Sequence, residues 1–506
     1  MTTDLVDTRM EMFSAYLYKT RMDHKSYQYD GVRWCLHNEL RKDPTCNVRG
    51  GFVADEMGLG KTIMMIGLMY CNFVPRTLIV VPPILIDQWY LQIYKTTGHK
   101  AFIYHGNAKK TTTLTRLMQA HIVITTYGAV TLTREQLKNK EQTLLHKVSW
   151  NRLIMDEAHH MRNPRTTRYL SAQLLSANIR WLVSGTPIQN SKKDFYSLCA
   201  LIGLPASFYS ATEQLKLLAR SFILKRTKKQ VGIVISDLRD DKVIVDWQSE
   251  QEMSLSEELH SALAFSRVNP EKGVNKSIVN TFRVGGTLNL MLRAKQSCIY
   301  PKLMTTQLDK FIRRGILTDY AGYREVFNHS SKLDAVTHAI IARKDNGCGK
   351  LVFCQFREEL DEMARRLRAG GIASVATFDG RTSHKKRRDI LGERNDVLIL
   401  QIQTGCEGLN LQEHYSEIYF VSPHWNPSVE DQAIARCHRI GQTKSVYVQR
   451  FEMSSFATDL YSDSTTTTTI EKYVNGIQDT KRNACNAFTI YTTPPIEKDR
   501  TVSCFV

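Results

Sequence analysis

The segment Val53–Met65, which reads VADEMGLGKTIMM, contains residues that could bind a phosphate group. A phosphate-binding loop has the pattern G-x-x-x-x-G-K-[ST], in which backbone N–H groups surround the phosphates, the lysine reaches them and the hydroxyl group binds Mg²⁺. Gly60, Lys61 and Thr62 match the end of this pattern. Asp55, however, stands where the first glycine belongs. Taken alone, the segment is as consistent with a chance match in a glycine-rich turn as with a nucleotide site.

A pair of adjacent carboxylates, Asp156 and Glu157, directly follows an apolar run in the segment RLIMDEAHH. Such a pair is usually a solvated turn. At the end of a strand and downstream of a GKT sequence, one carboxylate could instead hold Mg²⁺ through water while the other polarises the attacking water. A further apolar run ends in Ser184, Gly185 and Thr186, a small hydroxyl-bearing turn that could sense the phosphate site. Together these segments favour a site for nucleotide hydrolysis.

These clusters need a framework that brings them together. Each belongs to a short apolar run that ends in a polar or glycine-rich turn and continues into a helix-like segment, as do TLIVVPPILIDQW and HIVITTYGAV. Strands that alternate with helices in this way predict a parallel sheet, and ligands bind beyond the carboxyl ends of its strands. The helix that begins at KTIMMIGLMY would direct its N-terminal N–H groups and its dipole toward a phosphate.

The alternation of strands and helices occurs twice along the chain. It stops near Ile235 and returns from GKLVFCQF to about Phe451. Between these two parts, SLSEELHSALAFSRV and TLNLMLRAKQ predict helices, and IEKYVNGIQDTKRNA predicts another near the C-terminus. We therefore predict an α/β fold with two parallel-sheet lobes, a helical section between them and a C-terminal helical extension. The predicted parts are an N-terminal extension at 1–24, a first lobe at 25–235, the helical section at 236–330, a second lobe at 331–455, and the helix and tail at 456–506.

The composition narrows the classes of partner and compartment. With 68 Lys+Arg against 50 Asp+Glu, the net charge is +18, which favours a polyanionic partner, with nucleic acid ahead of membrane. The 11 cysteines form no C-x-x-C pair, which argues against a zinc ribbon, a RING domain and a disulfide framework. The N-terminus lacks an apolar run of the signal-peptide type, and the most apolar stretch, TLIVVPPILI, is too short to cross a bilayer. We expect a soluble intracellular protein.

The segment WNPSVEDQAIARCHRIGQ predicts a helix with defined ends. Asn426 can cap its N-terminus, Pro427 fits its first position and Gly441 can close it. Three polar residues, spaced by four and then three positions, would share one face of this helix: Gln432, Arg436 and Arg439. Such a face is usually a solvated surface.

In this order, DEMGLGKT, DEAH and SGTPIQN resemble the motifs of the ATPase motor of the Swi/Snf family, a branch of the superfamily-two helicases. That family has an aspartate where Asp55 stands, so the resemblance implies a working site for ATP and Mg²⁺ on two RecA-like lobes. It implies that Lys61 contacts the phosphates and that Asp156 and Thr62 hold Mg²⁺. Glu157 would be the base for water. The segment SYQYDGVRWCL resembles the family's adenine-recognising segment. The implied nucleotide contacts are Gln28, Asp55, Met57, Gly58, Leu59, Gly60, Lys61 and Thr62.

The segment WNPSVEDQAIARCHRIGQ resembles the family's last motif, whose arginines reach the γ-phosphate. The resemblance implies that Arg439 and Arg436 act as arginine fingers, which are worth on the order of 10³–10⁵ in rate in other NTPases. The residues implied in coupling the two lobes are Ser184, Gly185, Thr186 and Gln432. The likeness covers roughly Ser26 to Arg450, although Cys406 and Glu407 stand where the family usually has small residues.

A motor of this family holds the DNA backbone with hydroxyl groups, amides and basic side chains. The implied DNA contacts are Pro82, Gln88, Trp89, Thr125, Thr126, Tyr127, Gln355, Thr404 and Trp425. For Trp425, a core position is as consistent with the sequence as a DNA contact. The basic stretches LKRTKKQ and SHKKRR would add attraction that does not depend on DNA sequence, or could simply be solvated.

The resemblance implies a DNA-stimulated ATPase that moves along duplex DNA and shifts nucleosomes or displaces other DNA-bound proteins in transcription or repair. A strand-separating helicase uses the same two-lobe engine and is an alternative. A non-hydrolysing DNA-binding scaffold is a second alternative, against which the intact catalytic residues count. We expect a monomeric motor with no membrane partner, in the nucleus or, for a viral protein, at the site of viral replication.

Overall fold

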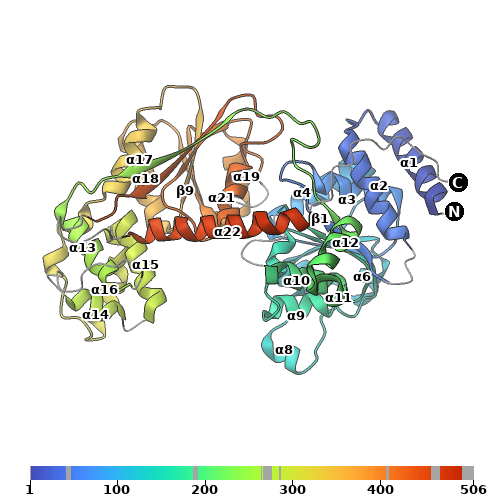
Figure 1. The fold of residues 1–506 in the computed structure, drawn as a ribbon, viewed down its shortest axis with the longest axis horizontal. Coiled ribbons are helices and arrows are strands. Elements are labelled where there is room, and N and C mark those ends of the chain that lie inside the picture. Colours follow the sequence, from blue (N-terminus) through green and yellow to red (C-terminus); the bar gives the residue numbers. More distant parts are fainter. Residues whose placement is uncertain are drawn as a thin grey trace. The chain divides into compact units, whose positions relative to one another are not determined.

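The computed structural model describes residues 2–41, 47–185, 192–263, 265, 276–283, 286–405, 409–456 and 468–492. The chain divides into two compact units, Met1–Val234 with Lys481–Val506, and Ile235–Thr480. Each unit contains a sheet whose paired strands are parallel, accompanied by helices (Figure 1). The predicted α/β fold with two parallel-sheet lobes is therefore confirmed.

The first unit is built on a seven-stranded sheet with the order β3-β4-β2-β5-β6-β1-β7. Its strands are β1 (Arg49–Val53), β2 (Thr77–Val81), β3 (Phe102–Tyr104), β4 (Ile122–Thr126), β5 (Trp150–Asp156), β6 (Ala177–Val183) and β7 (Ile223–Leu224). β2 is buried along its whole length, because helices cover both faces of a parallel sheet. Leu78 and Val80 therefore belong to one hydrophobic core. Ile79 and Val81 belong to the core on the opposite face.

Short and long helices alternate with these strands. They are α1 (Thr2–Lys19), α2 (Ser26–Leu40), α3 (Lys61–Cys71), α4 (Ile86–Thr97), α5 (Ala108–Thr111), α6 (Leu114–Gln119), α7 (Tyr127–Val130), α8 (Arg134–Lys138), α9 (Thr167–Gln173), α10 (Lys192–Ile202), α11 (Ser207–Ser210) and α12 (Thr212–Phe222), with 3₁₀ turns at Pro83–Leu85 and Ala158–Met161. Val6, Met10 and Phe13 of α1 are buried in the same core as α2 and α3. The N-terminal segment is thus part of the first unit.

A buried ion pair fixes α2 to the sheet of the first unit. The guanidinium group of Arg152 in β5 donates two hydrogen bonds to the carboxylate of Glu39 in α2, at 2.6 and 2.5 Å. The indole N–H of Trp181 in β6 donates to the same carboxylate at 2.8 Å. Because both charged side chains are almost fully buried, each depends on the other for compensation.

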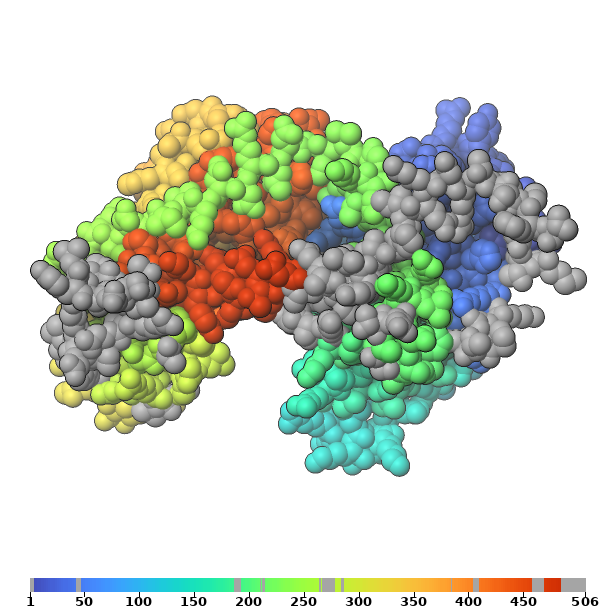
Figure 2. All heavy atoms as spheres, viewed as in Figure 1, coloured from blue at the N-terminus to red at the C-terminus, as the bar shows by residue number. Residues whose placement is uncertain are grey.

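The second unit has a six-stranded sheet with the order β10-β11-β9-β12-β13-β8. Its strands are β8 (Leu238–Val245), β9 (Gly349–Cys354), β10 (Val375–Phe378), β11 (Val397–Gln401), β12 (Tyr415–Phe420) and β13 (Val446–Met453). β8 corrects the prediction that 236–330 is helical, because this strand pairs with β13 along its full length. The β-branched run Val243–Val245 favours that pairing. Figure 2 shows β8, in green, at the surface of the unit, where most of its residues are exposed.

The helices that lie wholly or, for α22, up to Thr480 in the second unit confirm three that the sequence predicts, namely α13, α15 and α22. They are α13 (Glu250–Ser261), α14 (Lys276–Arg283), α15 (Gly286–Ile299), α16 (Thr305–Arg313), α17 (Ser331–Ile341), α18 (Arg357–Ala369), α19 (His384–Gly392), α20 (Ile402–Gly405), α21 (Pro427–Ile434) and α22 (Ile470–Thr492), with 3₁₀ turns at Pro301–Met304, Ala321–Tyr323 and Val326–Asn328. α13 to α16 gather into one group (Figure 1). A single core joins these helices to the sheet, α17, α18 and the start of α22. Among the described residues, none of the helices has both the length and the apolar character that crossing a membrane requires.

Candidate nucleotide site

The three clusters that the sequence predicts at strand ends meet at one edge of the first sheet. β1, β6 and β5 are neighbours, and their paired residues run parallel. The glycine-rich loop follows β1, Ser184 and Gly185 follow β6, and Asp156 is the last residue of β5. β1, the loop and α3 form a strand–turn–helix unit whose helix begins at Lys61. This unit lies beside two further strand ends, as a phosphate site in a parallel sheet requires.

The loop before α3 depends on its glycines. Gly58 and Gly60 have φ angles of 93° and 81°, a left-handed conformation that side chains with a Cβ adopt at a cost. A Cβ on Gly60 would also collide with Nε2 of Gln28. That amide donates a hydrogen bond to the carbonyl oxygen of Leu59 at 3.0 Å, so Gln28 lies against the phosphate-binding loop. The structure thus brings the predicted adenine contact and the loop together.

Asp55 is completely buried, and an arginine compensates its charge. The Arg226 guanidinium donates to both carboxylate oxygens, at 3.2 and 2.6 Å, and to the carbonyl oxygen of Tyr27. Arg226 therefore connects the predicted adenine segment with the strand end that carries the loop. Sequence reasoning missed this residue. A charged side chain in place of a loop glycine could have indicated that a cation lies nearby, but not which one.

Lys61 is held by the loop itself. Its ammonium group donates to the carbonyl oxygens of Asp55 and Glu56, at 2.9 and 3.3 Å. Gly185 passes close by, since a Cβ there would lie 2.8 Å from Cγ of Met57 and 3.2 Å from Nζ of Lys61. A glycine at this position lets the turn after β6 approach the loop. The predicted Thr186 lies outside the described residues.

Asp156 lies in an environment that raises its pKa to about 6, first through burial and then through the neighbouring charge of Glu157. One carboxylate oxygen accepts a hydrogen bond from the indole N–H of Trp89 at 2.8 Å. Trp89 is fully buried, and its predicted contact with DNA stays a prediction. Its indole orients the carboxylate that is predicted to hold Mg²⁺.

Glu157 has a left-handed backbone conformation, with φ at 52°, that is uncommon outside glycine. It starts the 3₁₀ turn after β5. Its carboxylate lies 3.3 Å from Nδ1 of His159, and the same nitrogen lies 3.3 Å from the hydroxyl oxygen of Ser184. His159 therefore connects the predicted base with the predicted coupling turn, a role that the sequence did not reveal.

Four more residues predicted to contact DNA have little exposure in the first unit. Pro82, Thr125, Thr126 and Tyr127 are buried. The Thr125 hydroxyl donates to the Tyr104 carbonyl oxygen, Thr126 caps α7, and the Tyr127 hydroxyl donates to the Asp156 carbonyl oxygen at 2.6 Å. These side chains support the strand ends, and their predicted contacts with DNA stay predictions. Gln88, on α4, is half-buried and retains an accessible part.

In the second unit, α21 begins as predicted but ends early. The Asn426 side chain accepts a hydrogen bond from the Ser428 N–H, and Pro427 is the first helical residue. The helix ends at Ile434, so Arg436 and Arg439 lie beyond it, and the prediction of one helical face shared with Gln432 is wrong. Tight turns replace the last helical turns, with the Arg436 N–H bonded to Ala433 and the Arg439 N–H to Cys437. Gln432 itself is buried.

Arg439 belongs to a partly buried cluster rather than an open face. It donates a hydrogen bond to the side-chain oxygen of Asn410, and burial followed by the charge of Arg436 lowers its pKa. Among the other predicted contacts, Gln355 and Trp425 are half-buried. Thr404 belongs to α20, and its side chain lies outside the described part of the chain.

A mostly apolar cavity of about 340 Å³ opens beside Gln28 in the first unit. Its lining includes Phe13, Leu17, Gln28, Ile63, Met64 and Lys95. The lining thus includes residues in the first part of α3, directly after the phosphate-binding loop. An apolar cavity with an amide at its edge suits a planar base that carries both a donor and an acceptor.

Comparison with known proteins identifies both parts of the chain. Residues 27–212 match the model of the SNF2-related domain, and residues 331–441 match that of the helicase conserved C-terminal domain. The chain belongs to the Swi/Snf family of helicase-like ATPases. ATP is accordingly the nucleotide that this enzyme uses.

Relatives within the Swi/Snf family include viral, plant and yeast proteins. A probable global transactivator of Orgyia pseudotsugata multicapsid polyhedrosis virus is 27% identical, over 91% of this chain and 90% of that protein. The ATP-dependent DNA helicase DDM1 of Arabidopsis thaliana is 26% identical, over 84% of this chain and 58% of that protein. The ISWI chromatin-remodeling complex ATPase ISW2 of Saccharomyces cerevisiae is 26% identical, but this chain covers only 38% of it. A solved Sulfolobus solfataricus SWI2/SNF2 ATPase core in complex with dsDNA is 23% identical, covers 86% of this chain and has a TM-score of 0.38.

The residues of this Swi/Snf ATPase fit a nucleotide-bound Mg²⁺. Among the residues that the structure describes, no three His, Cys, Asp or Glu side chains converge as metal ligands. A Mg²⁺ that arrives with ATP needs only one or two protein oxygens, because phosphates and water complete its octahedron. The buried Asp156 carboxylate and the Thr62 hydroxyl, in the first turn of α3, are oxygen donors of that kind.

Proposed function

We propose that this protein is an ATP-driven motor that moves along duplex DNA and displaces nucleosomes or other DNA-bound proteins. The observation that carries the proposal is that the Lys61 loop follows β1 while Asp156 and Glu157 follow β5, at the same edge of the sheet and on either side of β6. The excess of 68 Lys+Arg over 50 Asp+Glu supports a polyanionic track. The chain spans nearly all of the viral relative but 58% or less of the plant and yeast ones, so the work of those larger proteins is not carried over.

Within the first unit, each residue of the site has a proposed part in hydrolysis. Lys61 leaves the loop carbonyls to bind the β- and γ-phosphates, and Gln28 pairs with adenine at the mouth of the cavity. Mg²⁺ bound with ATP would neutralise phosphate charge, held by Thr62 and Asp156. Glu157 then takes a proton from the attacking water, while His159 keeps its carboxylate near the Ser184 turn.

The second unit contributes the proposed response to the nucleotide and to DNA. Arg436 and Arg439 stabilise the charge of the γ-phosphate during hydrolysis. Gln355, Thr404 and Trp425 contact the DNA backbone or groove, together with Gln88 of the first unit. The basic sequence SHKKRR adds attraction to phosphates of any DNA sequence, whereas in LKRTKKQ of the first unit Arg226 and Lys228 are paired with Asp55 and Glu56. The proposed place of action is the nucleus or a site of viral replication.

The decisive experiment measures ATP hydrolysis by the full chain with no DNA, with single-stranded DNA and with blunt duplex DNA. Glu157→Gln removes the base without changing the shape of the side chain. Glu141→Gln, at an exposed position of the same unit, is the matched control. We expect strong stimulation by duplex DNA that is lost in Glu157→Gln and kept in Glu141→Gln, followed by displacement of the third strand from a DNA triplex.

Other outcomes would redirect the proposal. Stimulation only by single strands, with separation of a tailed duplex, would establish a strand-separating helicase instead. DNA binding without ATP turnover under any condition would establish a scaffold and refute the motor.

A further inference from the structure

The segment 422–426 of the second unit is held through its backbone by three different elements. It connects β12 to α21 and contains Trp425. The Gln355 amide, after β9, donates to the carbonyl oxygens of Ser422 and Pro423, at 3.3 and 2.9 Å. Two further carbonyl contacts come from α15 and α22. Each of three consecutive carbonyl oxygens thus has a side-chain donor from outside the segment.

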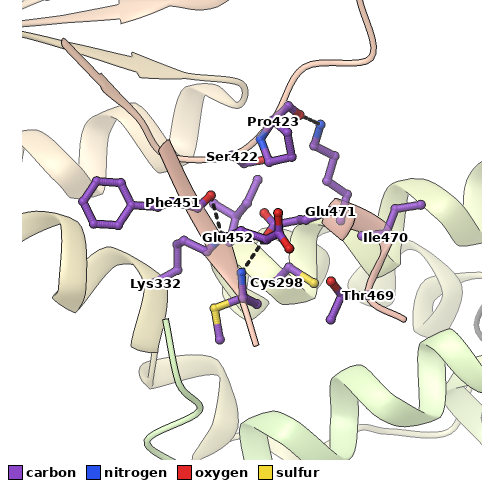
Figure 3. Close-up of polar contacts among 12 residues, drawn as sticks. Cys298, Lys332, Ser422, Pro423, Phe451, Glu452, Thr469, Ile470 and Glu471 are labelled. Carbon is purple, nitrogen blue, oxygen red and sulfur yellow. Dashed lines mark hydrogen bonds and ion pairs between the residues drawn. The ribbon is translucent and has the colours of Figure 1, made fainter. Parts of the chain in front are cut away.

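The donor from α15 is Lys295, whose ammonium group is 2.6 Å from the Pro423 carbonyl oxygen (Figure 3). The side chain is 3% exposed, and burial lowers its pKa to about 8. Taking an ammonium group out of water is costly, and a neutral carbonyl repays less of that cost than a carboxylate would. Its Nζ also lies 5.9 Å from the centre of the Trp425 ring. Lys295 therefore contacts both the backbone of the segment and its aromatic side chain.

The donor from α22 is Gln478, which is almost fully buried. Its amide donates to the His424 carbonyl oxygen at 2.5 Å and to the Glu430 carboxylate at 2.9 Å. That carboxylate, in α21, also accepts from the His424 N–H at 2.6 Å and from Arg450 in β13. Gln478 consequently joins the segment to the first turn of α21.

Buried contacts fix the part of α22 that delivers Gln478. The Glu471 carboxylate forms a fully buried ion pair with Lys332 at 2.5 Å and accepts the Met453 N–H at 2.8 Å (Figure 3). The Ile470 N–H donates to Nε2 of His260 at 2.9 Å. The buried side chains of α22 before residue 481 recur at helical spacing, so one face packs on the second unit while the other is exposed (Figure 2).

We propose that Lys295 and Gln478 are positioning residues that seat the 422–426 segment, so that α15 and α22 set the place of Trp425 in the DNA-tracking surface of the second unit. This inference rests on the proposed function, because it assigns a position-dependent role to Trp425 on DNA. The contact of Trp425 with DNA would then depend on α15 and α22, two elements that lie outside the family's motifs in the sequence. Losing a donor should allow the segment to leave this position for part of the time.

The test replaces each donor by an unbranched apolar side chain, in Lys295→Met and Gln478→Met. Lys310→Met on α16 and Lys472→Met on α22 remove exposed charges elsewhere in the second unit and are the controls. Amide hydrogen exchange of peptides that cover 420–426 measures how firmly the segment is held, and it does not depend on ATPase activity. We expect exchange there to rise about tenfold or more in the two test variants, because a buried bond that closes the segment is lost, and to stay unchanged in the controls.

The second readout is the amount of triplex displaced per ATP hydrolysed. We expect it to fall about tenfold in the test variants, since a small misplacement of a contacting group is costly, while ATP turnover without DNA stays within about twofold of the wild type. In a Trp425→Ala background, Lys295→Met should produce no further loss. Unchanged amide exchange in both test variants would refute the proposal that Lys295 and Gln478 hold the 422–426 segment in place. Additive losses of displacement in the double variant would refute the proposal that they act through Trp425. If duplex DNA does not stimulate ATP turnover by the wild-type protein, the proposed motor function is refuted. The exchange data would still decide whether Lys295 and Gln478 hold the 422–426 segment.

Discussion

Replacing Arg226 by methionine should expose the electrostatic cost of the aspartate in the phosphate-binding loop. Asp55 is fully buried, and Arg226, with 18% of its side chain exposed, supplies two hydrogen bonds to it. Removing one partner of a buried ion pair costs about 3–5 kcal/mol, because the other charge is left uncompensated. The partial exposure of Arg226 places the expected loss near the lower end, at about 3 kcal/mol. For a unit of this size, such a loss lowers the melting temperature by about 6–12 °C.

Calorimetry on the full chain, together with the ATP concentration dependence of turnover, measures both consequences. Arg226 also bonds to the Tyr27 carbonyl oxygen, so we expect the variant to need a higher ATP concentration as well as to melt earlier. Lys229→Met, three residues later and exposed, is the control for loss of a positive charge.

The double variant that adds Asp55→Asn decides whether the buried charge is the cause. It removes the uncompensated carboxylate at nearly constant shape, so its melting temperature should exceed that of Arg226→Met by about 4 °C or more. A double variant that melts at or below the temperature of the single variant would refute the reasoning, because lost packing rather than charge would then explain the effect.

Further predictions concern buried groups elsewhere. Glu39→Ala leaves Arg152 uncompensated among the strands of the first unit and should cost about 3–5 kcal/mol in chemical unfolding, against a small effect for an exposed glutamate. Burial lowers the pKa of His260 from 6.5 to about 4, so the unfolded chain binds a proton that the folded chain excludes. His260 alone should therefore contribute a loss of about 3 kcal/mol in the free energy of unfolding as the pH drops from 6.5 toward 4, and the difference between the unfolding curves of wild type and His260→Gln measures that contribution. Gly185→Ala would press on Nζ of Lys61 and should reduce ATP turnover with little change in melting temperature.

The parts of the site that could be predicted from the sequence are those that local chemistry determines. A strand that ends in a polar turn before a helix fixes its own direction, and parallel strands place their carboxyl ends at one edge. This is why the loop before Lys61 and the carboxylates after β5 could be placed together without knowing the order of the strands. The start of α21 is local for the same reason, because Asn426 and Pro427 act on the residues next to them.

The parts that were missed depend on partners that are distant in the sequence. Nothing near Asp55 indicates that its counter-charge is Arg226, 171 residues away. The same applies to Trp89, which shares the buried face of α4 with Ile86 and Ile93 but whose indole N–H bonds to Asp156, 67 residues away. The early end of α21 is a tertiary effect too, since the backbone N–H of Leu411 bonds to the carbonyl oxygen of Arg436 just where another helical turn would need that group.

Both units use buried charge to hold a loop rather than to add stability. A buried ion pair seldom gains more free energy than well-packed apolar side chains would, yet a single removal is expensive. A buried charged side chain therefore raises the free energy of any loop position in which its partner is lost. It adds little to the stability of the observed position. Asp55 with Arg226 does this for the phosphate-binding loop, and Lys295 does it for the segment that contains Trp425. The motor proposed above would have to move its binding surfaces in every cycle without letting the surfaces themselves deform. Buried charges that are compensated in only one local geometry meet that requirement, because each loop is then held rigidly to its own unit.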